Sequence, residues 1–227
     1  MKQAIDFSHY EQEFLNVGSR RKSINTFMLL VSKGCILVRL GKHEYTVKSG
    51  HGFVIPFDCL HAITVLPGTI YSKVDFSARI TSPVCKEAGF FRKNPLINAV
   101  IDELIKCQAR DNETPLSGAS GNLLRVLADQ IGSLKVNTKS TSPELAAKYQ
   151  PVLACMLKGD SVTDKTACST IEQYLGYSIK ELKTCVVMRE ALRLARSGRK
   201  PHQIAETLKT DESLLVAMAQ PILGHAL

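Results

Sequence analysis

Five basic side chains lie close together near the end of the sequence, where they could bind phosphate. They are Arg189, Arg193, Arg196, Arg199 and Lys200. Glu190 is the only acidic residue within this stretch, so the cluster has a strong local positive charge. Guanidinium and ammonium groups at this density can pair with nucleic-acid phosphates. The solvated face of an amphipathic helix would give the same pattern, and both interpretations stay open on charge alone.

A second set of polar side chains precedes this cluster, in a helix predicted over residues 163–176. Ala167, Ile171 and Leu175 recur every four residues and predict a buried face. Thr163 is the expected N-cap. The residues expected to point outward and contact bases are Lys165, Thr166, Cys168, Ser169 and Gln173. Such a helix can enter the DNA major groove and present its N-terminal residues to base edges.

A long helix over residues 178–198 connects this block to a second one. Leu182 and Val186 share the helical phase of Arg189 and Arg193, so that side of the helix cannot be wholly exposed. Gly198 is the expected end of the helix. The flanking blocks, residues 152–176 and 202–224, each have a helix–turn–helix pattern. We therefore predict two helix–turn–helix modules joined by one helix.

The last helix, predicted over residues 213–224, is less suited to reading DNA. Asp211 or Ser213 can cap it, and Pro221 is expected to break or kink it because proline lacks the backbone donor. Its expected buried residues are Leu214, Leu215, Met218 and Ile222. Its expected outward residues are Glu212, Ser213, Val216 and Ala217. That face offers no positive charge, so we expect weak base recognition there.

The elements before residue 135 predict a β-domain followed by two helices. Six β-rich runs between residues 24 and 80 are separated by turn residues and predict an all-β barrel or sandwich. Amphipathic helices are predicted over 95–108 and 121–134, and their broad apolar faces favour a homodimer through helices near Leu96 and Leu123. Packing of both helices on their own barrel is the alternative. The polar stretch 136–143 is the expected linker.

Composition indicates a soluble globular protein. The chain has 227 residues, 44% of them hydrophobic and 22% charged, and a formal net charge of +8. We expect a cytoplasmic location, because the sequence shows neither a signal peptide nor a membrane span. The seven cysteines include no C-x-x-C pair, which favours small buried hydrophobes over a disulfide framework or a zinc site.

The sequence between residues 150 and 224 resembles the DNA-binding region of the AraC/XylS family of transcription regulators. The positions that match its signature are Ile171, Gly176, Ser178, Leu182, Ala191, Ile204, Ala205, Leu208 and Gly224. The family usually has Gly-Phe where this chain has Lys209-Thr210. The resemblance implies binding to double-stranded DNA, with bases read by the first module and phosphates bound by the basic helix.

The N-terminal half is similar to a cupin motif, through Gly50, Pro56 and His61. A catalytic cupin needs several His and acidic ligands for a metal, and only His61 matches such a position. No nucleophile constellation or phosphate-binding glycine loop is evident. We therefore predict no enzyme activity, no catalytic residues, no metal and no cofactor. The residues that could line an effector pocket, or form plain core, are Phe27, Leu29, Val54, Ile55, His61, Ile63 and Val74.

Together these patterns predict an α+β protein with two domains. A cupin-like sensing and dimerisation domain spans residues 1–135, with the barrel at about 24–82 and helices at about 94–135. A linker covers 136–143, and an AraC-type DNA-binding domain with a degenerate second module covers 144–227. The expected function is transcription regulation set by a small-molecule or protein effector, without membrane attachment. The alternative is an interaction protein that acts by binding another regulator.

Overall fold

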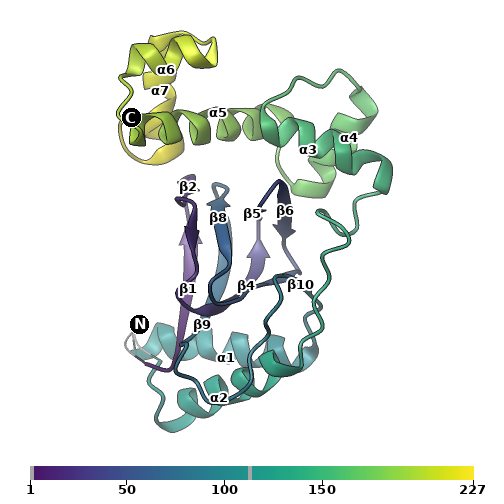
Figure 1. The fold of residues 1–227 in the computed structure, drawn as a ribbon, viewed down its shortest axis with the longest axis vertical. Helices are drawn as coiled ribbons and strands as arrows, with labels where there is room; N and C mark the ends of the chain where they lie inside the picture. Colours follow the sequence, from purple (N-terminus) through teal and green to yellow (C-terminus); the bar gives the residue numbers. More distant parts are fainter. Residues whose placement is uncertain (1–2, 112–113) are drawn as a thin grey trace.

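The computed structural model describes residues 3–111 and 114–227 of the chain. A β-domain lies in the middle of the molecule, with helices on two opposite sides of it (Figure 1). Its strands are β1 (Ile5–Gln12), β2 (Asn16–Val17), β3 (Arg21–Lys22), β4 (Thr26–Lys33), β5 (Cys35–Leu40), β6 (His43–Lys48), β7 (Gly52–Ile55), β8 (Leu60–Val65), β9 (Thr69–Phe76) and β10 (Gly89–Phe91). The predicted α+β class is confirmed.

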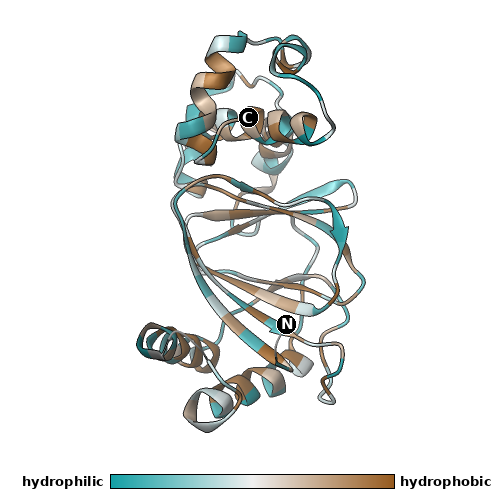
Figure 2. Cartoon of the chain, turned by 90° about the vertical axis from the view of Figure 1, so that its left-hand side faces the viewer, coloured by the Kyte–Doolittle hydropathy of each residue, from teal (hydrophilic) through white to brown (hydrophobic). Residues whose placement is uncertain are grey.

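Two antiparallel sheets face one another in the β-domain (Figure 2). Sheet A has the order β1-β9-β4-β7-β10, and sheet B has the order β2-β8-β5-β6, with β3 also paired to β8. All six predicted strands are present, as β4 to β9. Strands β1, β2, β3 and β10 were not predicted from the sequence, and with β1 the β-domain begins at Ile5 rather than near residue 24.

Strand β4 shows why this part of the sequence is so continuously apolar. Phe27, Leu29 and Val31 point into the core between the two sheets. Met28 and Leu30 point to the other face of sheet A, into the core that the helices cover. Successive residues of a strand face opposite sides, so a strand covered on both faces needs an unbroken apolar run.

Two helices, α1 (Pro95–Asp111) and α2 (Gly118–Ser133), cover the outer face of sheet A (Figure 1). Leu104 and Leu124 are fully buried there, in the same core as Val74 of β9. The face expected to form a dimer is only partly exposed: Leu96 is 48% exposed, while Leu123 packs partly buried against this core. The predicted homodimer remains a prediction.

The C-terminal helices lie on the opposite side of the β-domain, over sheet B (Figure 1). They are a 3₁₀ turn (Ala147–Tyr149), α3 (Gln150–Lys158), α4 (Lys165–Leu175), α5 (Ile179–Arg196), α6 (Pro201–Leu208) and α7 (Glu212–Leu223). The pairs α3–α4 and α6–α7 stand at the two ends of α5 (Figure 1). The described helices thus follow the predicted order of two helical pairs joined by one long helix. No helix within the described ranges has the length and apolarity to cross a membrane.

Helix caps fix where these helices begin and end. The carboxylate of Asp164 accepts from the backbone N–H groups of Thr166 and Ala167, so Asp164 is the N-cap of α4 and the prediction of Thr163 is wrong. Ser178 and Glu181 form a reciprocal capping box at the start of α5. Gly198 follows the end of α5 with a positive φ of 86°, as predicted.

Helix α7 departs from two expectations. Asp211 is its N-cap, and its buried residues are Leu215, Ala219 and Leu223. Leu214, which was expected to be buried, is 52% exposed. Pro221 does not break the helix, which continues to Leu223. Only two helical residues follow Pro221, so little helix lies beyond it to be broken or kinked.

The predicted linker is ordered along the β-domain. Asn137 and Phe90 exchange two backbone hydrogen bonds, and the N–H of Thr46 donates to the carbonyl of Thr141. The two predicted domains also share a core. The β-domain contributes to the same hydrophobic cluster as the C-terminal helices through Leu15, Val17, Cys35, Leu37 and Leu66. The structure thus presents the two predicted domains packed together.

Candidate functional site

Helix α4 presents the polar face that the sequence predicts for base contacts. Lys165, Thr166, Ser169 and Gln173 are exposed, and Ala167, Ile171 and Leu175 are buried beneath them. Cys168 differs from the expectation, because it is partly buried and packs against the core. Lys165 and Thr166 stand in the first turn of this helix, whose N-terminus is fixed by a side-chain cap, and Ser169 and Gln173 follow along it. Such a surface can donate and accept hydrogen bonds at base edges.

Two tyrosines attach the end of α4 to the β-domain. The Tyr174 hydroxyl donates to the carbonyl of Pro143 at 2.8 Å and lies 3.3 Å from the Thr46 hydroxyl. The Tyr177 hydroxyl donates to the carbonyl of Pro67 at 2.9 Å. Burial raises the pKa of Tyr174 to about 12 and also raises the pKa of Tyr177, so both hydroxyls keep their protons at neutral pH. These contacts fix the first helical pair relative to the β-domain.

Arg189 does not lie on an exposed phosphate-binding face in this structure. Its Nη1 lies 2.5 Å from Glu44 Oε1, and its Nη2 donates to the carbonyl of Leu157 at 2.6 Å. The two charged side chains are only 14% and 11% exposed. The physical reason is the one seen in the sequence: Arg189 shares its helical phase with Leu182 and Val186, which are buried.

Arg193 and Arg196 lie on the same side of α5 and line a cleft between this helix and the β-domain. Arg193 pairs with Glu190 at 2.6 Å, one helical turn away, and this hydrogen bond lowers the pKa of Glu190. Arg196 is exposed and has no ion pair with any residue in the described ranges. Arg193 and Arg196, which the sequence predicts to contact phosphates, therefore face the cleft and not the outer side of α5.

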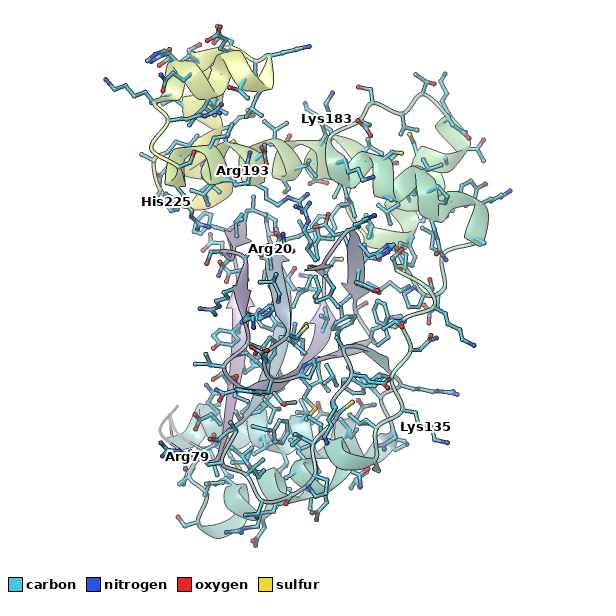
Figure 3. All side chains as sticks on the ribbon, viewed as in Figure 1. Arg20, Arg79, Lys135, Lys183, Arg193 and His225 are labelled. Atoms are coloured by element: carbon cyan, nitrogen blue, oxygen red, sulfur yellow. The ribbon has the colours of Figure 1, made fainter. Side chains whose placement is uncertain are left out.

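The outer face of α5 carries two lysines that the sequence analysis missed. Lys180 and Lys183 are exposed and stand roughly opposite Arg189 in the helical phase. Figure 3 shows Lys183 on the side of α5 away from the β-domain, while Arg20 lies on the side of the β-domain. The helical phase of Leu182 and Val186 was the signal that could have identified them, because the opposite phase must be the solvated one.

Arg199 and Lys200 lie in the exposed turn between α5 and α6. The Arg199 guanidinium donates to the hydroxyl of Thr207 at 2.9 Å, and Lys200 precedes the first residue of α6. Both remain accessible to a phosphate. On α7 the outward residues expected from the sequence, Glu212, Ser213, Val216 and Ala217, are exposed, and Leu214 joins them. This second face is acidic and apolar.

A cavity of about 800 Å³ opens between the β-domain and the end of α1, and it contains part of the predicted effector pocket. Phe27, His61 and Ile63 line it. The other four predicted residues, Leu29, Val54, Ile55 and Val74, are at most 1% exposed and form plain core. Of the two roles that the sequence left open, pocket lining or core, these four residues have the second in this structure.

His61 presents a hydrogen-bond acceptor to this cavity. Its Nδ1 lies 2.9 Å from the carbonyl of Cys59, and a carbonyl can only accept, so Nδ1 carries the proton and Nε2 does not in the neutral ring. Burial lowers the pKa of His61, an effect that the Cys59 hydrogen bond opposes and that Arg21 and Lys73 strengthen. Lys73 pairs with Asp75 at 2.6 Å and lies over the Phe27 ring. The wall thus offers acceptors and cations beside aromatic surface.

No group of three or more His, Cys, Asp or Glu side chains that could hold a metal ion occurs within residues 3–111 and 114–227. All seven cysteines lie in these ranges and have free thiols. Burial raises the pKa of the Cys35 thiol to about 12 and that of Cys185 to about 11. These two thiols are therefore protonated at neutral pH.

Comparison with known proteins gives matches only among solved structures. No family model and no curated protein matches the sequence. Apo ToxT K231A from Vibrio cholerae strain SCE256 is similar at 9% identity and a TM-score of 0.42, over 99% of this chain and 96% of that chain. ToxT from Vibrio cholerae O395, bound to (E)-4-(8-methylnaphthalen-1-yl)but-3-enoic acid, is similar at 12% identity and a TM-score of 0.38, over 98% and 95%.

A cupin superfamily protein from Desulfitobacterium hafniense is similar at 10% identity and a TM-score of 0.31, over 34% of this chain and 71% of that protein. All of these TM-scores lie below 0.5. The fold described above therefore rests on the strands, helices and contacts of the chain itself.

Proposed function

We propose that this chain is a DNA-binding transcription regulator of the AraC type. The observation that carries the proposal is the α4 surface. Lys165, Thr166, Ser169 and Gln173 stand exposed along a capped helix, and the following helix places Lys180 and Lys183 on its outer side. A polar helix for base edges beside lysines for phosphates is the arrangement that helix–turn–helix proteins use on duplex DNA.

The roles divide between the two ends of α5. The first module reads bases, and the phosphate contacts come from Lys180, Lys183, Arg199 and Lys200, which are all exposed. Arg189 has a structural role in this assignment, because Glu44 neutralises it. The second module contributes little base recognition, since α7 exposes no basic side chain. We also propose that the chain is not an enzyme.

The β-domain is proposed to sense an effector in the cavity lined by Phe27, His61 and Ile63. A small polar molecule that donates a hydrogen bond to His61 fits its wall. The proposal also includes a homodimer through α1 and α2, where Leu96 is exposed, and a cytoplasmic location.

Selection from a pool of random DNA duplexes tests the proposal. The full chain should enrich a defined sequence, and Lys165→Ala and Gln173→Ala should weaken binding to it and relax the preference at the bases they contact. Arg79→Ala and Lys135→Ala are matched controls at the far end of the molecule (Figure 3). Recovery of no sequence above the unselected pool would contradict the proposal.

A second candidate function is an interaction protein that binds another regulator. Leu214 and Val216 favour it, because they are 52% and 48% exposed on the helix that would otherwise read DNA. If this candidate is correct, Leu214→Ser should abolish binding to the partner regulator and leave the fold intact. In that case the duplex selection should recover nothing.

A further inference from the structure

A cleft of about 1320 Å³ lies between sheet B and the helices α3 and α5. One wall belongs to the β-domain and carries Arg20 and Arg39. The other wall belongs to α5 and carries Arg189, Arg193 and Arg196. The cleft therefore brings together guanidinium groups from parts of the chain more than 140 residues apart.

The cations exceed the acids that could neutralise them. Five arginines line the cleft against two carboxylates, those of Glu44 and Glu190. Glu44 pairs with Arg189 and lies 3.6 Å from Arg39, and Glu190 pairs with Arg193. Arg20 and Arg196 have no ion pair with any residue in the described part of the chain, and they stand on opposite walls. Lys42 and Lys158 add further positive charge at the rim.

Helix stability accounts for only part of this pattern. Arg193 and Arg196 lie in the last turn of α5, where a positive charge interacts favourably with the helix dipole. That explanation does not apply to Arg20 and Arg39, which come from the β-domain. Like charges brought together across a cleft repel one another, so their convergence favours an anionic occupant.

We propose that this cleft is a binding site for a small phosphorylated ligand with at least two anionic groups, which bridges the β-domain and α5. Arginine matches phosphate through its planar fork of donors. A monocarboxylate carries one negative charge, whereas a pyrophosphate group carries enough charge to neutralise both Arg20 and Arg196, the two arginines of the cleft without an ion pair in the described part of the chain. Ala62, Pro151 and Val186 give the cleft an apolar part that can contact the body of such a ligand.

The site does not depend on the proposed DNA binding, and its test contains no DNA in the first arm. Isothermal titration of the full chain at low ionic strength should show saturable binding of sodium pyrophosphate and of ATP. Arg20→Ala and Arg196→Ala, one from each wall, should each weaken the affinity about tenfold, as expected for one lost charge-assisted hydrogen bond. Arg79→Ala, far from the cleft, should leave it unchanged (Figure 3).

Two further arms separate the sources of an anion. Tighter binding of laurate than of pyrophosphate would overturn the phosphate assignment in favour of a monocarboxylate. If pyrophosphate and ATP do not bind, while Arg20→Ala and Arg196→Ala weaken binding to a DNA duplex, the cations serve the DNA backbone and the proposal fails. Equal pyrophosphate affinity in all variants would also contradict it. Circular dichroism of each variant checks that it is folded, and the exposed positions of Arg20 and Arg196 make loss of folding unexpected.

Discussion

The Arg189 guanidinium bridges Glu44 in β6 and the carbonyl of Leu157 at the end of α3. One side chain thereby joins the β-domain to both helices that face it. The sequence analysis assigned Arg189 to DNA phosphates, and in this structure its guanidinium group contacts Glu44 and Leu157 instead. The lysines that we propose for DNA phosphates, Lys180 and Lys183, lie on the opposite side of α5.

Removing either partner of this pair should destabilise the protein strongly. Arg189→Ala leaves the mostly buried Glu44 carboxylate with only the more exposed Arg39, 3.6 Å away, and the expected loss in the free energy of unfolding is about 3 kcal/mol. Arg193→Ala is the matched control, since its pair with Glu190 is largely exposed and should contribute less than about 1 kcal/mol. Urea denaturation measures both values. Equal losses in the two variants would contradict the assignment.

The N-cap of α4 gives a second prediction. Asp164→Ala removes the acceptor for two backbone N–H groups and should lower the free energy of unfolding by about 1 kcal/mol. Thr163→Ala changes the residue beside the cap and should have an effect below about 0.5 kcal/mol. Thermal or urea denaturation distinguishes the two variants. A larger effect of Thr163→Ala would indicate that Thr163 is the N-cap, as expected from the sequence.

The phase of α7 is tested by two neighbouring leucines. Leu215 is fully buried, so Leu215→Ala should cost about 3 kcal/mol through lost burial and the cavity left behind. Leu214 is half-exposed, and Leu214→Ala should cost less than about 1 kcal/mol. If denaturation curves show the reverse order, α7 is rotated about its axis relative to this structure.

His61 should make stability depend on pH below neutrality. Because burial lowers its pKa in the folded state, the unfolded chain binds the proton more readily. The contribution of His61 is present above the unfolded pKa of about 6.5, and it is lost as the pH falls through that value towards the folded pKa. Denaturation of the wild type and of His61→Gln between pH 5 and about 8 should show a smaller slope in the variant. His202→Gln, at an exposed position, should keep the wild-type slope.

The sequence predicted most elements because their patterns are local. The apolar runs of β4 to β9 and the four-residue repeat of Ala167, Ile171 and Leu175 need no knowledge of the rest of the chain. Strand β1 was missed although Ile5 and Phe7 alternate with polar residues, because only two of its residues are buried. The short strands β2, β3 and β10 exist through pairing with distant strands, which no local pattern records.

The functional site was predicted only in part for a related reason. Exposure on α4 follows from helical phase, and the sequence placed Lys165, Thr166, Ser169 and Gln173 accordingly. The arginines of α5 have a partner wall formed by Arg20, Arg39 and Glu44, which lie far away in the sequence. The density of basic residues in the sequence therefore predicted a cationic surface. The residues that this surface faces could be identified only from the tertiary structure.

The proposed DNA binding is best tested by the affinity for a selected DNA duplex as a function of salt concentration. The logarithm of the association constant should fall linearly with the logarithm of salt concentration, and Lys183→Ala should reduce the steepness by about one phosphate contact. Lys135→Ala should leave the slope unchanged. The absence of binding at low salt would contradict the proposed DNA binding. So would a slope that Lys183→Ala leaves unchanged and that Arg193→Ala reduces.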